Sequence, residues 1–291
     1  MPQFSVIIPT YNRAHLVNES IQSVLDQTYS DVEIIVVDDG STDNTKTVVE
    51  TFADDRIKYI YQKNAERGAA RNNGVLHSSG KYVFFLDSDD KLDPDHLDFA
   101  NKNLQELGTP EFFHIRYREE YPDTIMQVEK LNKSSILQRT LEQNQFACQF
   151  FLREDIARKF PFINSKDLKI GEDWYVVLRI ALRYPLYFSN EVKATIVHHG
   201  ERSMEISSPD VILTSREELI NALKKDKRIT NEILNNVYVE HTTLAALAAS
   251  IKGQKKVACR LLYKAFKKKK NVIVKRRTLA IIKKVIFGQN A

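Results

Sequence analysis

The first ninety residues alternate short apolar runs with stretches in which apolar residues recur every three or four positions. A short apolar run that ends in turn-forming residues predicts a buried strand, and the longer recurrence predicts an amphipathic helix. On this basis we expect strands at residues 4–8, 33–37, 57–61 and 82–86, and helices at residues 14–27, 43–52 and 65–77. This alternation predicts an α/β fold with a Rossmann-like, mostly parallel sheet flanked by helices.

Polar segments follow three of these strands, at residues 10–13, 38–40 and 87–89. The carboxyl ends of parallel strands meet at one edge of a sheet, and open α/β sheets bind their ligands there. The sequence therefore predicts a binding site at this edge.

Beyond residue 93 the pattern is less regular. We expect a helix at 94–107, strands near 111–118, 147–152 and 192–197, and a helix from 171 to about 183. From about residue 215 the helical pattern continues to the end. A first domain is therefore expected at residues 1–212, followed by a helical region at residues 213–291.

The net charge of +5 conceals an uneven distribution. Residues 252–284 contain 14 Lys or Arg and no Asp or Glu, so the first 251 residues carry −9. Such a split indicates two parts with different partners. No apolar stretch predicts a membrane-spanning helix, and the N-terminus lacks the pattern of a signal peptide. The two cysteines, Cys148 and Cys259, are far apart, which favours a reducing compartment such as the cytoplasm.

Two carboxylates, Asp87 and Asp89, follow the fourth predicted strand with one residue between them. Mg²⁺ and Mn²⁺ prefer oxygen ligands and keep positions open for phosphate, so a cation held here could bridge a diphosphate. The alternative is a solvated acidic turn or a helix cap. The position directly after a buried strand favours the metal interpretation.

The ends of the first two strands carry groups suited to a nucleotide. A carboxylate of Asp38 or Asp39 could accept a hydrogen bond from a base or a ribose, although Asp is also an ordinary turn residue. Tyr11 could stack on a base, and Arg13 could face a phosphate. Without the neighbouring motifs, Arg13 would be read as a surface charge.

An acidic pair, Glu172 and Asp173, opens the helix predicted near residue 171. The helix dipole alone explains an acid there, but a carboxylate could also act as the general base that removes a proton from an acceptor hydroxyl. Trp174 could offer an apolar face to a sugar ring or pack in the core. Farther along, His198 and His199 could complete a metal shell or touch a phosphate, or could be structural.

In order and combination, these segments resemble the family 2 glycosyltransferases, whose fold is called GT-A. The matching segments are SVIIPTYN at residues 5–12, VDDGSTD at 37–43, ARN at 70–72, FLDSDD at 85–90 and GEDW at 171–174. The resemblance spans residues 4–200. It implies inverting transfer of a sugar from a nucleoside-diphosphate donor, with UDP as the expected nucleotide and Mn²⁺ or Mg²⁺ as the cofactor.

The resemblance also implies roles for individual residues. Asp39 and Arg71 would contact the base, Asp89 would be the direct metal ligand and Asp173 would be the catalytic base. The full set expected at the nucleotide sugar is Thr10, Tyr11, Arg13, Asp38, Asp39, Arg71, Asp87 and Ser88. The set expected at the metal is Asp89, Asp87 and His199, and the set expected at the acceptor is Glu172 and Trp174. Because Asp90 extends the acidic run, the metal assignment is open among these neighbours.

Residues 1–212 are accordingly expected to form the GT-A catalytic domain, with a nucleotide-binding half at 1–92 and an acceptor half at 93–212. The expected reaction is a single in-line displacement onto a glycan or lipid-linked acceptor in cell-surface polysaccharide or glycoconjugate synthesis. Two alternatives are a sugar-nucleotide nucleotidyltransferase, which usually needs a Gly-rich basic loop after the first strand, and a non-catalytic binding module. A dinucleotide dehydrogenase is disfavoured because Gly-x-Gly-x-x-Gly is absent there.

The basic tail mixes apolar residues with Lys and Arg clusters. A basic amphipathic helix suits an anionic membrane surface, so residues 252–287 are expected to contact the inner face of the cell membrane. Nucleic acid is a weaker alternative because the tail has few aromatic residues for base stacking. Packing on the catalytic domain or on a second subunit is the structural alternative. The apolar residues concerned are Leu261, Leu262, Ala265, Phe266, Ile273, Val274, Leu279, Ile281, Ile282, Val285 and Ile286.

Overall fold

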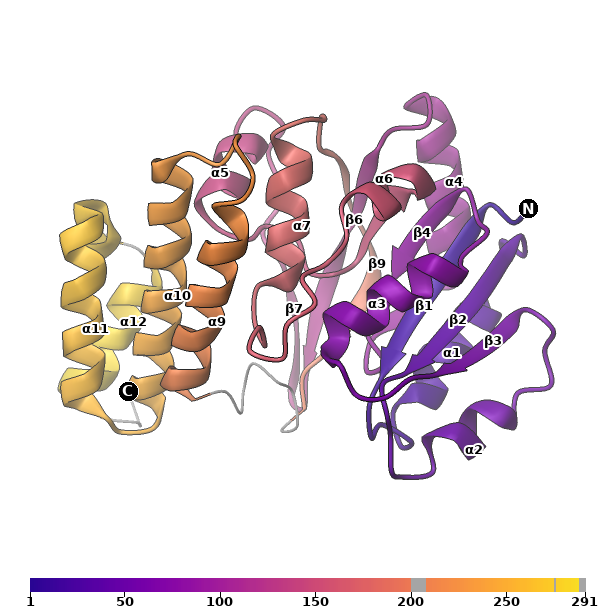
Figure 1. Cartoon of the computed structure of the whole chain (residues 1–291), viewed down its shortest axis with the longest axis horizontal. Coiled ribbons are helices and arrows are strands. Elements are labelled where there is room, and N and C mark those ends of the chain that lie inside the picture. The colour runs from indigo at the N-terminus through magenta and orange to yellow at the C-terminus, as the bar shows by residue number, and fades with distance from the viewer. Residues whose placement is uncertain (200–207, 275, 288–291) are drawn as a thin grey trace. The chain divides into compact units, whose positions relative to one another are not determined.

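A computed structural model describes residues 1–199, 208–274 and 276–287 (Figure 1). Gly200, which follows the predicted His198-His199 pair, and Lys275 of the basic tail lie outside the described residues.

The predicted parallel sheet is present. Its first four strands run in the spatial order β3-β2-β1-β4, and all three of these pairings are parallel. The strands are β1 (Phe4–Thr10), β2 (Val32–Asp38), β3 (Ile57–Tyr61) and β4 (Tyr82–Phe85). The helices between them are α1 (Val17–Leu25), α2 (Thr45–Glu50) and α3 (Glu66–His77). These elements agree with the predicted ones to within a few residues at each end.

The second half of the chain extends the same sheet with both parallel and antiparallel pairs. After β4 the order continues β8-β6-β9-β5, with β7 paired to the outer part of β6. These strands are β5 (Lys91–Leu92), β6 (Phe112–Tyr121), β7 (Thr124–Gln127), β8 (Phe150–Arg153) and β9 (Tyr187–Val197). The helices of this part are α4 (His96–Glu106), α5 (Ile136–Glu142) and α6 (Glu154–Lys159). Of these, β5, β7, α5 and α6 were not expected from the sequence.

Alternating side chains of the central strands face opposite layers of helices. Phe4, Val6 and Ile8 of β1 are fully buried in one cluster with residues of α1 and α4. Ile7 faces the other way, toward α3. Burial on both faces explains why the sequence shows continuous apolar runs here instead of strict alternation.

The chain divides into two compact units. The first comprises residues 1–137, 146–165 and 180–199 and contains every strand that the structure describes. The second comprises residues 138–145, 166–179 and 200–291. It contains most of α7 (Glu172–Ala181), then α9 (Pro209–Leu223), α10 (Asn231–Ile251), α11 (Lys255–Lys268), the 3₁₀ helix η1 (Lys270–Val274) and α12 (Arg276–Phe287). Asp173 therefore belongs to the helical unit, and the remainder of the predicted acceptor half is shared between the two.

The basic tail packs through an apolar face within the second unit. Leu261 and Ile281 are buried in a cluster with alanines of α10, and Leu262 and Val285 pack against that cluster. This corresponds to the packing alternative for that face. Phe266, by contrast, is exposed, as are Leu279 and Ile286. Among the described helices, none is long and apolar enough to cross a membrane.

Candidate active site

The loops that follow β1 and β2 are joined by Asn12. The Asn12 backbone N–H donates to Ser41 Oγ at 2.8 Å, and its side-chain Oδ1 accepts from the backbone N–H of Thr42 at 2.8 Å. The preceding residue, Tyr11, is 48% exposed. The ring is thus available for the predicted stacking on a base. Arg13, in the same loop, is half-buried and donates its backbone N–H to Thr45 Oγ1.

Asp38 supports the turn after β2. Its Oδ1 accepts from the Ser41 N–H at 2.7 Å, and its Oδ2 accepts from the Tyr59 hydroxyl at 2.6 Å. Burial and then this hydrogen bond raise the pKa of Tyr59, so the phenol remains a donor. Asp38 is only 1% exposed and both its oxygens accept hydrogen bonds within the protein, so it has a structural role in this turn, and its predicted contact with the nucleotide stays a prediction.

Asp39, the next residue, accepts hydrogen bonds through one carboxylate oxygen. It is 3% exposed, and its Oδ1 accepts from Gln62 Nε2 at 2.6 Å and from the Ala65 N–H at 2.9 Å. Its backbone N–H donates to the carbonyl of Thr10. Thr10 Oγ1 is buried without a hydrogen-bond partner among the described residues. A buried hydroxyl in that state is costly unless a ligand or water satisfies it, which is consistent with the predicted role of Thr10.

Arg71 is buried against the acidic turn. Its Nη2 lies 2.7 Å from Asp87 Oδ1, and its guanidinium lies over the ring of Phe162, with Cζ 5.3 Å from the ring centroid. The side chain is only 1% exposed. The buried guanidinium therefore orients the carboxylate of Asp87. The predicted contact of Arg71 with the base stays a prediction.

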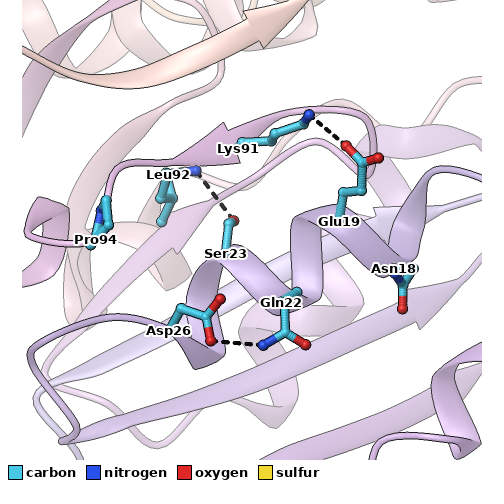
Figure 2. Close-up of a pocket in the computed structure, with 8 residues that line it drawn as sticks. All are labelled: Asn18, Glu19, Gln22, Ser23, Asp26, Lys91, Leu92 and Pro94. Carbon is cyan, nitrogen blue, oxygen red and sulfur yellow. Dashed lines mark hydrogen bonds and ion pairs between the residues drawn. The ribbon is translucent and has the colours of Figure 1, made fainter.

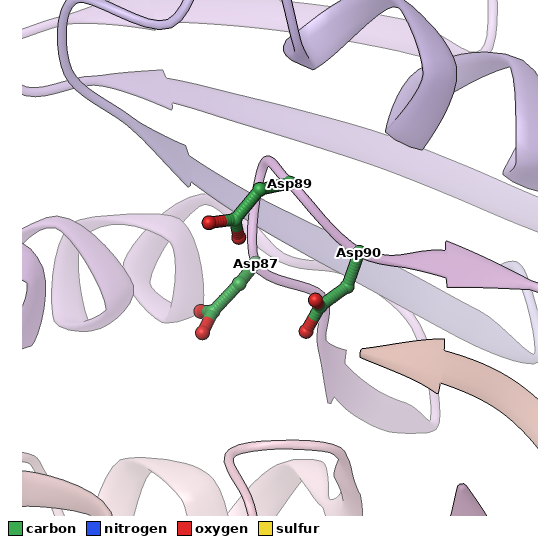
Figure 3. Close-up of side chains that lie close together, drawn as sticks. All are labelled: Asp87, Asp89 and Asp90. Atoms are coloured by element: carbon green, nitrogen blue, oxygen red, sulfur yellow. The ribbon is translucent and has the colours of Figure 1, made fainter. Parts of the chain in front are cut away.

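The acidic turn after β4 brings three carboxylates together (Figure 3). Ligand oxygens of Asp87, Asp89 and Asp90 lie within 4.8 Å of one another, and Ser88 between them is nearly buried. Oxygen donors this close suit a hard divalent cation, so the residues present fit the expected Mn²⁺ or Mg²⁺.

The third acid of the turn has an internal role. Asp90 is 1% exposed, and its two oxygens accept from Gln149 Nε2 at 2.9 Å and from the Val197 N–H at 3.1 Å. These bonds join the turn to the β8 region and to the end of β9. Asp90 is therefore the least suited of the three to bind a cation, which leaves Asp87 and Asp89.

The end of β9 carries the two predicted histidines. His199 Nε2 lies 2.8 Å from Asp89 Oδ2, so His199 contacts the expected metal ligand. His198 instead stacks on Tyr121, with ring centroids 4.0 Å apart and planes 11° from parallel. The structure thus separates the pair: His199 joins the acidic turn and His198 packs on β6. Direct binding of a cation by His199 stays a prediction.

In the helical unit, Asp173 is oriented by two donors. Asn144 Nδ2 donates to Asp173 Oδ2 at 2.8 Å, and the Trp174 N–H at the start of α7 donates to Asp173 Oδ1 at 2.7 Å. These bonds hold the carboxylate in one orientation. The chain around Asn144 is fixed in turn, because Asn236 of α10 donates to the carbonyl of Leu141.

Trp174 is a core residue of the same unit. It is 1% exposed, its indole Nε1 donates to the Thr140 carbonyl at 2.8 Å, and its ring stacks on His241. This burial corresponds to the packing interpretation of Trp174, and its predicted acceptor contact stays a prediction. Glu172 is also largely buried, at 5% exposure, and its acceptor role stays a prediction.

Sequence reasoning did not identify Asn12, Gln62 or Asn144. Each has an amide that holds a loop or a carboxylate in place. Asn12 adopts a positive φ of 51°, which Asn tolerates better than most residues, so its position in the loop after β1 was the one available signal. Gln62 and Asn144 lie in polar segments without a distinguishing pattern.

An open pocket also lies between α1 and β5 (Figure 2). Its polar side chains mostly pair with one another: Lys91 with Glu19, and Gln22 with Asp26. None of the predicted site residues lines it. We assign it no function.

With this geometry in place, similarity to known proteins decides the family. The model of the family described as Glycosyl transferase family 2 matches residues 5–153. This chain belongs to glycosyl transferase family 2.

Two curated glycosyltransferases are similar to the chain. Glycosyltransferase GlyA of Streptococcus pneumoniae serotype 4 is 32% identical over 224 residues, covering 69% of this chain and 31% of GlyA. The GalNAc(5)-diNAcBac-PP-undecaprenol beta-1,3-glucosyltransferase of Campylobacter jejuni is 48% identical over 119 residues, covering 40% of this chain and 37% of that enzyme. The matched segments thus span about a third of each relative.

Solved structures of other transferases share the fold. Residues 1–349 of S. aureus TarS in complex with UDP-GlcNAc give a TM-score of 0.64 at 18% identity, over 99% of this chain and 92% of that one. The mannosyltransferase PcManGT of Pyrobaculum calidifontis, solved with GDP-Man and Mn²⁺, gives a TM-score of 0.57 at 19% identity, over 99% and 88% of the two chains. The predicted GT-A type α/β fold is confirmed.

Proposed function

We propose that this member of family 2 is an inverting, metal-dependent glycosyltransferase that moves a sugar from a UDP-sugar to a glycan or lipid-linked acceptor. The observation that carries the proposal is the carboxylate pair Asp87 and Asp89 at the end of β4. The ends of the neighbouring strands supply the unpaired hydroxyl of Thr10 and the carboxylate of Asp39. Such a set of groups suits a nucleoside diphosphate with its cation.

At the nucleotide, Asp39 would accept an N–H of the base while the exposed Tyr11 ring stacks on it. Asp87 and Asp89 would hold Mn²⁺ or Mg²⁺, with His199 as the partner of Asp89. When bound, the cation offsets the negative charge that develops on the diphosphate leaving group. Arg71 would keep Asp87 oriented throughout. The complex of TarS with UDP-GlcNAc supports the proposed nucleotide sugar, and the complex of PcManGT with GDP-Man and Mn²⁺ supports the proposed cation.

Asp173 is the proposed general base. The acceptor hydroxyl oxygen forms a bond to the anomeric carbon of the sugar as the bond from that carbon to the diphosphate oxygen breaks. The hydroxyl proton passes to Asp173, and the electron pair of the broken bond leaves with the nucleoside diphosphate. Attack from the face opposite the leaving group inverts the anomeric configuration, so no covalent enzyme intermediate is needed.

The proposed acceptor and location rest on two supports. The Campylobacter relative is named for a substrate on a PP-undecaprenol carrier, which favours a lipid-linked acceptor here. In addition, α11 presents a basic outer surface, made of Lys256, Arg260, Lys264 and Lys267, which are spaced on one face of the helix and exposed. We propose that this surface contacts anionic lipid at the cytoplasmic side of the cell membrane.

The proposal is tested with Asp173→Asn and Asp89→Asn on the full chain, using a panel of nucleotide sugars with Mn²⁺. Asp173→Asn should lower transfer by about 100-fold or more while donor affinity stays near that of the parent. Asp89→Asn should instead weaken Mn²⁺-dependent binding of UDP. The matched controls are Asp210→Asn on α9 and Glu106→Gln on α4, both exposed. Undiminished turnover of Asp173→Asn would reject the base assignment. Donor binding by the parent without transfer from any nucleotide sugar in the panel would instead favour a binding module.

A further inference from the structure

The carboxylate of Asp39 is held from one side only. Both donors to it, Gln62 Nε2 and the Ala65 N–H, contact Oδ1. Within the part of the chain that the structure describes, Oδ2 receives no hydrogen bond. A carboxylate that is 3% exposed with one engaged oxygen has its second oxygen ready for a ligand donor.

The amide that holds Asp39 is itself held. Asn73 Nδ2 on α3 donates to Gln62 Oε1 at 2.7 Å, and the Gln62 backbone N–H donates to the Asp38 carbonyl at 2.9 Å. A chain of side chains therefore runs from α3, through the residue after β3, to the end of β2. A hydrogen bond of 2.7 Å joins Asn73 to Gln62, and one of 2.6 Å joins Gln62 to Asp39. We call these three side chains the relay.

Only one polarity of this chain is chemically consistent. An ionised carboxylate accepts and cannot donate, so Gln62 must turn its NH₂ group toward Asp39. Its oxygen then faces Asn73, which must present its own NH₂ group. The direction of each bond in the relay is thus set by the acceptor oxygen of Asp39.

We propose that Gln62 and Asn73 are positioning residues that set the base specificity of the nucleotide site, by holding Asp39 through Oδ1 with Oδ2 directed to the ligand. This inference rests on the proposed function. An acceptor-only oxygen selects a base that offers a ring N–H, as uracil does, and rejects one that offers a lone pair at that position, as cytosine does. Gln62 contacts Asp39, and Asn73 contacts Gln62, so both would act on specificity through Asp39.

The sharpest test reverses the polarity at Asn73. Asn73→Asp replaces the donor with an acceptor of nearly the same shape, so the Gln62 amide must turn and present its oxygen to Asp39. Asn73→Ala only removes the donor. The relay therefore predicts that Asn73→Asp weakens UDP binding more than Asn73→Ala does, by about tenfold against about threefold at pH 7.5. If Asn73 merely packs, the larger deletion to Ala should be the worse of the two.

Gln62→Leu tests the second member, with Gln105→Leu on the exposed face of α4 as the matched control. Dissociation constants for UDP and CDP with Mn²⁺ are measured by calorimetry on the full chain. We expect the preference for UDP over CDP to fall by about tenfold in Gln62→Leu and to be unchanged in the control. The kcat at saturating donor should stay within about threefold of the parent, because the relay acts on donor binding. Thermal unfolding confirms that each variant is folded.

The outcomes separate the relay from the proposed function. A uniform loss of affinity for UDP and CDP in Gln62→Leu, or Asn73→Ala being worse than Asn73→Asp, overturns the relay even if the enzyme transfers sugar from UDP. A parent that prefers another nucleoside diphosphate overturns the proposed donor. In that case, a changed preference among diphosphates in the variants would still support the relay.

Discussion

Neighbouring carboxylates in this protein differ in what their oxygens contact. Asp38 uses both oxygens on Ser41 and Tyr59, whereas both donors to Asp39 contact a single oxygen. The same division recurs after β4, where Asp90 is engaged by Gln149 and Val197. At the scale of the residue, the partners of each oxygen distinguish acids that are fully engaged within the protein, such as Asp38 and Asp90, from Asp39, which has one oxygen without a donor among the described residues.

Glu33 is a structural acid whose stabilising effect depends on pH. It lies on β2 at 6% exposure, and its Oε1 accepts from Ser5 Oγ, from Ser79 and, at 3.2 Å, from the Gly80 N–H. Burial raises the pKa of Glu33, but hydrogen bonds from Lys58, Ser5 and Ser79 outweigh it and hold the pKa at about 2. The charged form is therefore the one that the fold stabilises.

Because the folded-state pKa lies below the unfolded one, the contribution of Glu33 is present above about pH 4.5 and is lost as the pH falls toward 2. Glu33→Gln should lower the free energy of unfolding by roughly 2 kcal/mol at pH 7. The deficit relative to the parent should shrink below pH 4, where the parent carboxylate is itself protonated. Urea unfolding at both pH values measures this. A deficit that is constant with pH would show that shape, not charge, matters at this position.

At the scale of the element, the sequence predicted best where a segment is long and buried. β1 to β4 and α1 to α3 were predicted because apolar runs and helical spacing are strong signals in buried parallel sheets. β5, β7, α5 and α6 were missed because they are short, and the four residues of β7 are all exposed. β9 begins five residues before the expected start at Val192, since its half-buried first part lacks an apolar run.

For the candidate site, the sequence predicted the positions of the motif residues better than the partners of their side chains. Motif positions located Asp39, Asp87, Asp89 and His199 correctly at strand ends. What they could not supply was the partner of each side chain, which comes from residues distant in sequence. The burial of Asp38 against Tyr59 and of Trp174 against His241 was not predicted, because these partners have no signal near the motif.

The entry to α7 depends on a glycine. Gly171 has a φ of 95°, and a Cβ there would lie 2.8 Å from His241 Nε2. Gly171→Ala should therefore destabilise the protein by about 2–3 kcal/mol, from backbone strain plus the clash. Gly253→Ala is the control for strain alone, since Gly253 has a φ of 72° and nothing within 4 Å of a Cβ. Equal losses in chemical denaturation would contradict a role for the His241 contact.

At the scale of the whole molecule, charge is segregated along the chain. The tail between residues 252 and 284 has no acid, while the remainder is net acidic. On α11 the buried positions are Ala258, Leu261 and Ala265, so the cations occupy the opposite, exposed side. Tyr263 is 57% exposed among them, with Lys267 Nζ 4.9 Å from its ring centroid. An exposed aromatic residue among cations suits a bilayer interface.

If that surface binds membrane, association should be electrostatic. Binding to vesicles of phosphatidylglycerol and phosphatidylcholine should fall several-fold between about 0.05 and 0.5 M salt, because screening shortens the reach of the charges. The triple variant Lys256→Gln, Arg260→Gln, Lys264→Gln should bind weakly even at low salt. The matched control replaces the exposed Lys63, Lys130 and Lys133 with Gln. Equal loss in the two triple variants would show that only net charge matters.

The hydrogen bonds that Asp90 makes to Gln149 and Val197 limit how the length of this turn can vary. One short turn supplies two outward acids and one that fastens β9, so the three positions are not interchangeable. Removing or adding a single residue there would turn Asp90 away from Gln149 and Val197 and would place another acid of the turn in the buried position. Length variation among relatives should therefore be absent from this turn even where the surrounding loops tolerate it.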